Sequence, residues 1–144
     1  MIELNTFILY EYDENNEEHN KTWDTLLKDP NFILFLGNDF GTNIKKATDE
    51  YSNIYIVYKE GIPIGMSSLY YLDNKYEVCY AIIPEYRSKG LATLLLDEFT
   101  NYIFNNTSIN DLYLYINDDN NKSIRVANKC GYNKTNNLEY KKSK

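Results

Sequence analysis

The sequence contains few cysteines, prolines, glycines and histidines. Among its 144 residues are Cys 2, Pro 3, Gly 6 and His 1. The two cysteines, Cys79 and Cys130, are too few for a disulfide framework, and no cluster of His, Cys and Asp has the spacing of a zinc site. The low glycine and proline content excludes collagen-like and low-complexity classes. We therefore expect a globular chain with two free thiols in its core and no bound metal.

The sequence also lacks long apolar runs, a targeting segment and an excess of basic charge. No run approaches the roughly 18 apolar residues that a membrane helix needs, and the first twenty residues have no positive n-region of a signal peptide. Lys+Arg 15 against Asp+Glu 21 gives a net charge of −6. An acidic chain is poorly suited to tracking nucleic-acid phosphates and better suited to a cationic partner such as a protonated amine. These features predict a cytoplasmic protein without a membrane or nucleic-acid partner.

Apolar residues are plentiful, and many of them are tyrosines. Hydrophobic residues make up 43% of the chain and aromatics 15%, with Tyr 15 the main contributor. A chain of this length buries about two thirds of its unfolded surface, which is enough for an unaided core. Length, the lack of internal repeats and the lack of a linker together predict a single domain over residues 1–144.

The period of the hydrophobic pattern changes several times along the chain. Runs of β-branched and aromatic residues predict strands at 7–10, 54–58, 62–71, 76–83 and 112–116. Turn residues at 59–61 and 73–74 join three of these strands into an antiparallel meander. Helical spacing predicts helices over the acidic stretch that ends before Asp29-Pro30, over 90–106 and over 123–129, the last ended by Gly131. We further expect a short apolar segment at 32–36, a loop or short helix over 38–50, and a weak strand or hairpin from Tyr132.

This element order predicts an α/β fold with a mixed sheet. One segment of it stands out, namely Ala81-Ile82-Ile83-Pro84-Glu85-Tyr86-Arg87-Ser88-Lys89-Gly90-Leu91-Ala92. It reads as a strand, a proline, and R-x-x-G-x-A opening a long amphipathic helix. The free amides and the dipole at such a helix start bind phosphate, and Gly90 permits close approach. Alternatively the glycine serves only the turn. The segment is neither a P-loop nor a Rossmann fingerprint.

The same segment resembles the acetyl-CoA motif of the GNAT family of N-acetyltransferases, V-x-P-x-[YF]-R-x-x-G-x-[GA], as it stands at 82–92. A second block of that family, N-x-x-S-x-x-x-x-x-K-x-G-[FY], is matched from Asn120 to Tyr132. Details around Glu77 and Ser123, and at the start of the chain, are most similar to the branch that acetylates ribosomal-protein N-termini. The resemblance implies an α/β fold with a mostly antiparallel central sheet and helices on both faces.

The resemblance also implies roles for particular residues, with acetyl-CoA as co-substrate. Backbone groups of Ile82 and Ile83 would hold the pantetheine and the thioester carbonyl. Asn120 would bond the pantetheine arm, and Ser123 would lie near the sulfur. The backbone amides that would cradle the pyrophosphate are those of Arg87, Ser88, Lys89, Gly90, Leu91, Ala92 and Thr93.

A base is needed because the attacking amine is protonated at neutral pH. Glu77 is the best candidate, acting directly or through water, with a surface carboxylate as the equal alternative. Strand alternation places Glu77, Cys79 and Ala81 on one face of the sheet. Tyr76, Val78, Tyr80 and Ile82 then share the other face. We expect a bulge near Ala81 to turn this face.

The sequence departs from the family at one position. Many relatives carry a tyrosine four residues before the second block's glycine, as general acid to the thiolate, whereas this chain has Ala127. Ser123, Tyr115 or Tyr113 are candidates to replace it, or no dedicated acid exists.

Three functions remain open from the sequence. The first is acetyl transfer to a primary amine, either a small molecule or a protein N-terminus, by a monomer or homodimer. The second is a non-catalytic acyl-CoA-binding module that acts as a sensor or partner. The third is an unrelated nucleotide-binding domain. We expect His19 and the lysines at 141–144 to be solvated, and the tyrosines of the strands, Tyr80 among them, mostly to pack.

Overall fold

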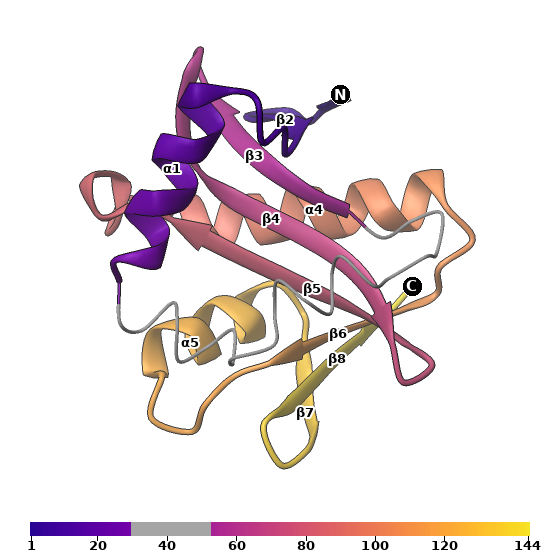
Figure 1. The fold of residues 1–144 in the computed structure, drawn as a ribbon. Helices are drawn as coiled ribbons and strands as arrows, with labels where there is room; N and C mark the ends of the chain where they lie inside the picture. The colour runs from indigo at the N-terminus through magenta and orange to yellow at the C-terminus, as the bar shows by residue number, and fades with distance from the viewer. Residues whose placement is uncertain (30–52) are drawn as a thin grey trace.

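An eight-stranded sheet runs through the middle of the molecule, with helices on both of its faces (Figure 1). The computed structural model describes residues 1–29 and 53–144, so our expectations for 32–36 and 38–50 lie outside the described residues. Among the strands of residues 1–29 and 53–144 the order is β1-β2-β3-β4-β5-β6-β8-β7, and only β5 and β6 of these pair in parallel. The strands are β1 (Ile2–Glu3), β2 (Ile8–Glu11), β3 (Asn53–Lys59), β4 (Ile62–Leu72), β5 (Lys75–Ile82), β6 (Asp111–Tyr115), β7 (Asn133–Asn136) and β8 (Glu139–Ser143).

Two tight turns produce the predicted meander of β3, β4 and β5. Glu60 and Gly61 both have positive φ, 52° and 79°, and so do Asp73 and Asn74, at 53° and 63°. Two successive residues of this kind make the turn whose twist matches paired antiparallel strands. The predicted hairpins at 59–61 and 73–74 are therefore confirmed.

The described helices are α1 (Glu17–Leu27), α4 (Leu91–Asn106), α5 (Asn121–Lys129) and the short 3-10 helix η1 (Pro84–Tyr86). The side chain of Asn16 caps α1 by accepting hydrogen bonds from two backbone amides. Gly131 follows the end of α5 with a φ of 85°, as its predicted place after the helix requires. No helix within 1–29 or 53–144 is long and apolar enough to cross a bilayer.

The sheet separates two clusters of buried side chains. Val78 and Ile82 of β5 belong to the larger cluster with Phe99 of α4, whereas Cys79 packs with Leu26 of α1 on the other face. The predicted alternation of β5 is thus confirmed. Both thiols, of Cys79 and Cys130, are free and buried, which confirms their expected place in the core.

The bulge lies in β4 rather than at Ala81. Val57 pairs with Gly65 while Tyr58 pairs with Pro63, which leaves Ile64 as the extra residue. The ladder between β4 and β5 continues without a break through Ala81. A Cβ placed on Gly65 would lie 2.1 Å from the Ala81 carbonyl oxygen, so glycine permits this close approach. The bulge therefore sits one strand away from where the sequence placed it.

His19 and the lysines Lys141 and Lys142, all expected in solvent, are instead at least partly buried, whereas Lys144 is exposed as expected. His19 is 4% exposed, and its Nδ1 accepts a hydrogen bond from the Asp13 amide at 3.1 Å. The lysine-rich end forms β8, which pairs with β6. Within it, Lys142 donates to the Cys130 carbonyl at 2.7 Å. Without β8, the strand β6 would be an edge strand with unpaired backbone groups. Pairing with β6 therefore orders the segment that carries these lysines.

Candidate active site

The site lies where β5 and β6 separate. The two strands pair only at Glu77 and Tyr113, and their ribbons diverge beyond that point toward α5 (Figure 1). A pocket of about 350 Å³ lies between the end of β5 and the starts of α4 and α5. All the expected cofactor-binding residues except Ile83 and Lys89 line it: Ile82, Arg87, Ser88, Gly90, Leu91, Ala92, Thr93, Asn120 and Ser123. The two motifs are thus brought together in one pocket.

The start of α4 offers unpaired backbone amides to this pocket. Ser88 and Gly90 have positive φ, 64° and 75°, and the first bond of the helix runs from the Leu94 amide to the Gly90 carbonyl at 3.2 Å. The amides of the first turn have no partner in the helix, so they and the dipole favour an anion. A Cβ at Gly90 would meet nothing within 4 Å, so this position opens on free space. The local geometry fits a diphosphate.

Arg87 braces the pocket instead of offering its amide. Its guanidinium pairs with Asp29 at 2.6 Å, and its Nε donates to the Ile82 carbonyl at 2.8 Å. Its own amide is donated to the Pro84 carbonyl at 3.2 Å. The expectation that the Arg87 amide contacts phosphate is therefore corrected. The side chain ties the end of β5 to the segment that follows α1.

The backbone of Ile83 is also fully used. Its amide donates to Ile64 at 2.8 Å, and its carbonyl accepts from Tyr86 at 3.0 Å. This corrects the expected role of Ile83. In an antiparallel ladder successive amides point to opposite sides, so the Ile82 amide points away from β4, toward the side where β6 has diverged. Ile82 is the residue of this pair that faces the pocket. Lys89 does not line the pocket, and its Nζ lies 5.3 Å from the centre of the Tyr86 ring.

The two polar residues of the second block meet at the start of α5. Asn120 caps the helix, its Oδ1 accepting from the Ser123 amide at 3.2 Å. A hydrogen bond from Asn120 to a ligand would therefore come from its Nδ2. Tyr80 enters the pocket from β5, beside Ser123 and Val126. The sequence analysis assigned Tyr80 to packing, although the predicted alternation already aimed it at this face.

Glu77 lies on the opposite face of β5 and outside the pocket lining. The Tyr70 hydroxyl of β4 donates a hydrogen bond to its carboxylate. Burial raises the pKa of Glu77 above its usual value, and the bond from Tyr70 partly opposes that rise. A half-buried carboxylate with a raised pKa is suited to accept a proton near neutral pH.

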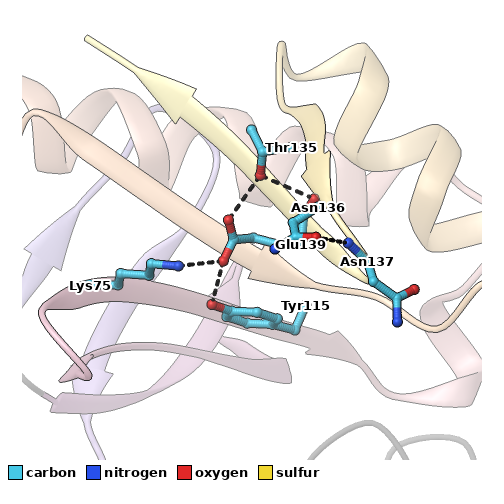
Figure 2. Close-up of polar contacts among 6 residues, drawn as sticks. All are labelled: Lys75, Tyr115, Thr135, Asn136, Asn137 and Glu139. Carbon is cyan, nitrogen blue, oxygen red and sulfur yellow. Dashed lines mark hydrogen bonds and ion pairs between the residues drawn. The ribbon is translucent and has the colours of Figure 1, made fainter.

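Tyr115 is not brought to the pocket. Its hydroxyl donates to Glu139 Oε2 at 2.8 Å, and Lys75 reaches the same oxygen at 2.6 Å (Figure 2). Thr135 donates to the other carboxylate oxygen at 2.9 Å. The expected role of Tyr115 as an acid to the thiolate is therefore corrected, because β8 places an acceptor beside it. Tyr113 instead lies under two ammonium groups, those of Lys75 at 5.0 Å and Lys141 at 5.7 Å from its ring centre.

Several pocket residues were not predicted as site residues. They are Asp29, Tyr80, Ala81, Tyr86, Lys122 and Val126. Asp29 could not be placed from local patterns, because its partner Arg87 is far along the chain. In residues 1–29 and 53–144, no three His, Cys, Asp or Glu side chains converge as metal ligands.

Comparisons with known structures agree with this architecture. A Salmonella typhimurium acetyltransferase that modifies the N-terminal serine of a 50S ribosomal subunit protein is 15% identical, with a TM-score of 0.72 over 97% of this chain and 96% of that one. The Campylobacter jejuni N-acetyltransferase PseH, in complex with acetyl coenzyme A, is 17% identical, with a TM-score of 0.67 over 94% and 95%. An aminoglycoside acetyltransferase in complex with coenzyme A is 15% identical, with a TM-score of 0.71 over 96% and 94%. At these identities the likeness establishes the fold.

The sequence comparison identifies the family. No curated protein shows significant sequence similarity to this chain. The model of the acetyltransferase (GNAT) domain, however, matches residues 10–133, which include both motifs and the whole of the strands β3, β4, β5 and β6. The match, the fold and the pocket at the divergence of β5 and β6 agree, and the chain therefore belongs to the GNAT family of acetyl-CoA-dependent N-acetyltransferases.

Proposed function

We propose that this enzyme acetylates a primary amine by direct attack on the thioester of acetyl-CoA bound in the pocket between β5, α4 and α5. The observation that carries the proposal is the start of α4, where unpaired amides and the open space at Gly90 face a pocket shared with Asn120 and Ser123. Acetyl-CoA supplies the activated acyl group. The amides of Leu91, Ala92 and Thr93 bind its diphosphate, and the Ile82 amide orients the pantetheine arm.

Glu77 acts as the base in this proposal. Its pKa is raised by burial, so it can take a proton from an ammonium group or from an intervening water at near-neutral pH. The hydrogen bond from Tyr70 holds the carboxylate in place and limits the rise of its pKa. Because Glu77 lies at the point where β5 and β6 separate, it faces the acceptor side of the sheet while the pocket holds the cofactor.

The acceptor is a cationic amine, either a small molecule or a protein N-terminus. The net charge of −6 favours the approach of a cation. Two structurally similar enzymes support the two kinds of acceptor, because one modifies an N-terminal serine and the other is an aminoglycoside acetyltransferase. We infer one catalytic domain over residues 1–144, working in the cytoplasm as a monomer or homodimer.

A binding module without turnover is the second candidate. Ala127 supports it, because this position lacks the tyrosine that many relatives use. Release of free thiol from acetyl-CoA distinguishes the two. We expect release with at least one member of an amine panel that includes an aminoglycoside and a peptide with an N-terminal serine. Acetyl-CoA binding with no release for any amine would favour the binding module.

The first experiment is calorimetric titration with acetyl-CoA, CoA and ATP. Gly90→Asp places a carboxylate against the diphosphate, and we expect it to abolish binding of acetyl-CoA. Gly61→Asp is the matched control, because Gly61 also has positive φ and open space around its Cβ position but lies in the turn between β3 and β4. Gly61→Asp should bind acetyl-CoA normally. If the folded wild-type protein binds ATP but neither CoA compound, the proposal is wrong.

A further inference from the structure

The Tyr80 hydroxyl is a buried polar group with no partner at hydrogen-bond distance among the described residues, although the Ser123 side chain is near enough to lower its pKa. It belongs to a residue that lines the acetyl-CoA pocket, next to Ser123 at the start of α5. A buried hydroxyl that makes no hydrogen bond costs about 1–3 kcal/mol. At a ligand pocket, a bound ligand can supply the missing partner.

The place of Tyr80 along β5 indicates which part of the ligand it meets. Ile82 lines the pocket near the start of α4, and Glu77, the proposed base, lies nearer the start of β5 and outside the lining. At about 3.3 Å per residue, Tyr80 lies about 10 Å from Glu77 along the strand, on the side of the sheet that faces α5. The reacting end of acetyl-CoA must lie between these two residues for Glu77 to serve the amine.

On α5, Ser123 lines the pocket together with Tyr80, whereas Ala127 lies in the core cluster against which Tyr80 packs. Ala127 on α5 is fully buried and small, and Ser123 lies one turn before it. The Ser123 hydroxyl is close enough to lower the pKa of Tyr80, although burial raises that pKa by more. The pocket is therefore lined by a phenol from β5 beside Ser123, whereas the alanine at position 127 supplies no hydroxyl.

We propose, on the basis of the function proposed above, that Tyr80 is a catalytic residue whose hydroxyl donates a hydrogen bond to the sulfur of acetyl-CoA and stabilises the thiolate as it leaves. The amine nitrogen bonds to the acyl carbon, the carbon–sulfur bond breaks, and its electron pair stays on sulfur. Glu77 takes the first proton, from the ammonium group, and the second proton leaves the nitrogen for solvent once the acyl–nitrogen bond has formed. Tyr80 keeps its own proton, and the thiolate is protonated by solvent when CoA is released.

The test compares Tyr80→Phe with the wild type for binding of CoA and of desulfo-CoA, which lacks the sulfur. We expect Tyr80→Phe to bind CoA about tenfold more weakly and desulfo-CoA equally well. In the wild type, CoA affinity should rise as pH passes through the thiol pKa, and this rise should be smaller in Tyr80→Phe. Thermal stability without ligand should not fall, because the hydroxyl has no partner to lose.

Tyr132→Phe is the control for removal of a buried phenol. Its hydroxyl bonds to Thr100 at 2.7 Å and does not line the pocket, so CoA binding should be unchanged. Equal CoA affinities for Tyr80→Phe and the wild type would overturn the assignment of Tyr80 alone. An equal loss with CoA and desulfo-CoA would do the same, because the effect would not depend on sulfur. Failure of the folded wild-type protein to bind either ligand would overturn the proposed function with it.

Discussion

Glu77 combines two properties that rarely occur together at a surface carboxylate. It is half-buried, with a raised pKa, and it accepts a hydrogen bond from Tyr70. Burial raises the pKa of this carboxylate, and the hydrogen bond from Tyr70 limits how far the pKa rises. The kinetics of variants at these two positions therefore separate a catalytic carboxylate from a structural one.

We expect Glu77→Gln to lower kcat by about 10²–10⁴-fold while the Kd for acetyl-CoA stays the same. In the wild type, the rate should rise with pH on a limb displaced above the usual glutamate pKa, because Glu77 must lose its proton to act. Tyr70→Phe removes a bond that lowers this pKa, so its limb should move to still higher pH. Rate–pH profiles at saturating acetyl-CoA check both effects. An unchanged kcat in Glu77→Gln would mean that Glu77 is a surface carboxylate and not the catalytic base.

Gly65 is the residue whose missing side chain fixes the end of β5. We expect Gly65→Ala to lower the free energy of unfolding by about 1–3 kcal/mol, because its Cβ would lie 2.1 Å from the Ala81 carbonyl oxygen. The shift of β5 should also weaken acetyl-CoA binding. Urea unfolding and calorimetry measure the two effects.

Gly61→Ala is the control for Gly65→Ala. It strains a residue with a φ of 79° but has no neighbour within 4 Å and lies outside the acetyl-CoA pocket. It should lose stability while binding acetyl-CoA with wild-type affinity. If Gly65→Ala also kept wild-type affinity, the close approach of β4 to β5 would not shape the pocket.

At the scale of elements, α1 and α5 begin in the same way but in different places. Asn16 and Asn120 each cap a helix by accepting backbone amide hydrogen bonds through the side-chain oxygen. Only Asn120 lines the acetyl-CoA pocket. Comparing variants of Asn16 and Asn120 therefore separates the contribution of an N-cap to folding stability from its contribution to ligand binding.

We expect Asn16→Ala and Asn120→Ala each to lower the free energy of unfolding by about 1 kcal/mol, the usual cost of a lost N-cap. Only Asn120→Ala should also raise the Kd for acetyl-CoA. Chemical denaturation and calorimetry on both variants provide the comparison. Equal acetyl-CoA affinity in the two variants would mean that Asn120 serves the helix alone.

The elements that could be predicted from the sequence are those set by neighbouring residues. The turns at 59–61 and 73–74, the start of α4 at Gly90 and the end of α5 at Gly131 depend on local backbone preference, and all were predicted. The pairing of β8 with β6 depends on chain segments far apart. For that reason the lysines at the end of the chain were misplaced, and Tyr115 was assigned to a site that its bond to Glu139 does not allow.

The site shows the same division. Its motif residues could be located because their spacing is diagnostic, and the structure gathers most of them around one pocket. The contacts that hold these motif residues in place could not be predicted. Arg87 forms an ion pair with Asp29, which is far away in the chain, and the Ile83 amide donates to the Ile64 carbonyl. Tertiary contacts of this kind decide which backbone and side-chain groups remain available to bind a ligand.

At the scale of the whole molecule, Glu139 connects three parts of the sheet. It accepts hydrogen bonds from Lys75 at the start of β5, Tyr115 of β6 and Thr135 of β7 (Figure 2). The bond from Lys75, followed by that from Tyr115, holds the pKa of Glu139 below its usual value. A carboxylate with a lowered folded-state pKa stabilises the fold above its unfolded pKa, and this contribution is lost as pH falls through the folded value.

We therefore expect the wild-type protein to lose stability steadily below about pH 4.5, the ordinary value for this carboxyl, and Glu139→Gln to show a shallower decline. Urea midpoints over a pH series measure the difference. Glu60→Gln is the control, because Glu60 is 83% exposed and its pair with Lys59 lies in a turn. Parallel curves for Glu139→Gln and the wild type would contradict the assignment.

The sheet has two parts, β1–β5 and β6–β8, which are joined only by the short pairing of β5 with β6 at Glu77 and Tyr113, here called the seam. The pairs β1–β2, β3–β4 and β4–β5 join strands that are close in the chain, whereas the pairs β2–β3 and β5–β6 join strands that are far apart in it. A chain with such long-range closure gains its last contacts late in folding. In the proposed binding mode acetyl-CoA lies beside this seam, so we expect its concentration to add about 1.4 kcal/mol of folding stability for every tenfold excess over Kd. We therefore expect a shortage of acetyl-CoA to expose more of the open form to proteases.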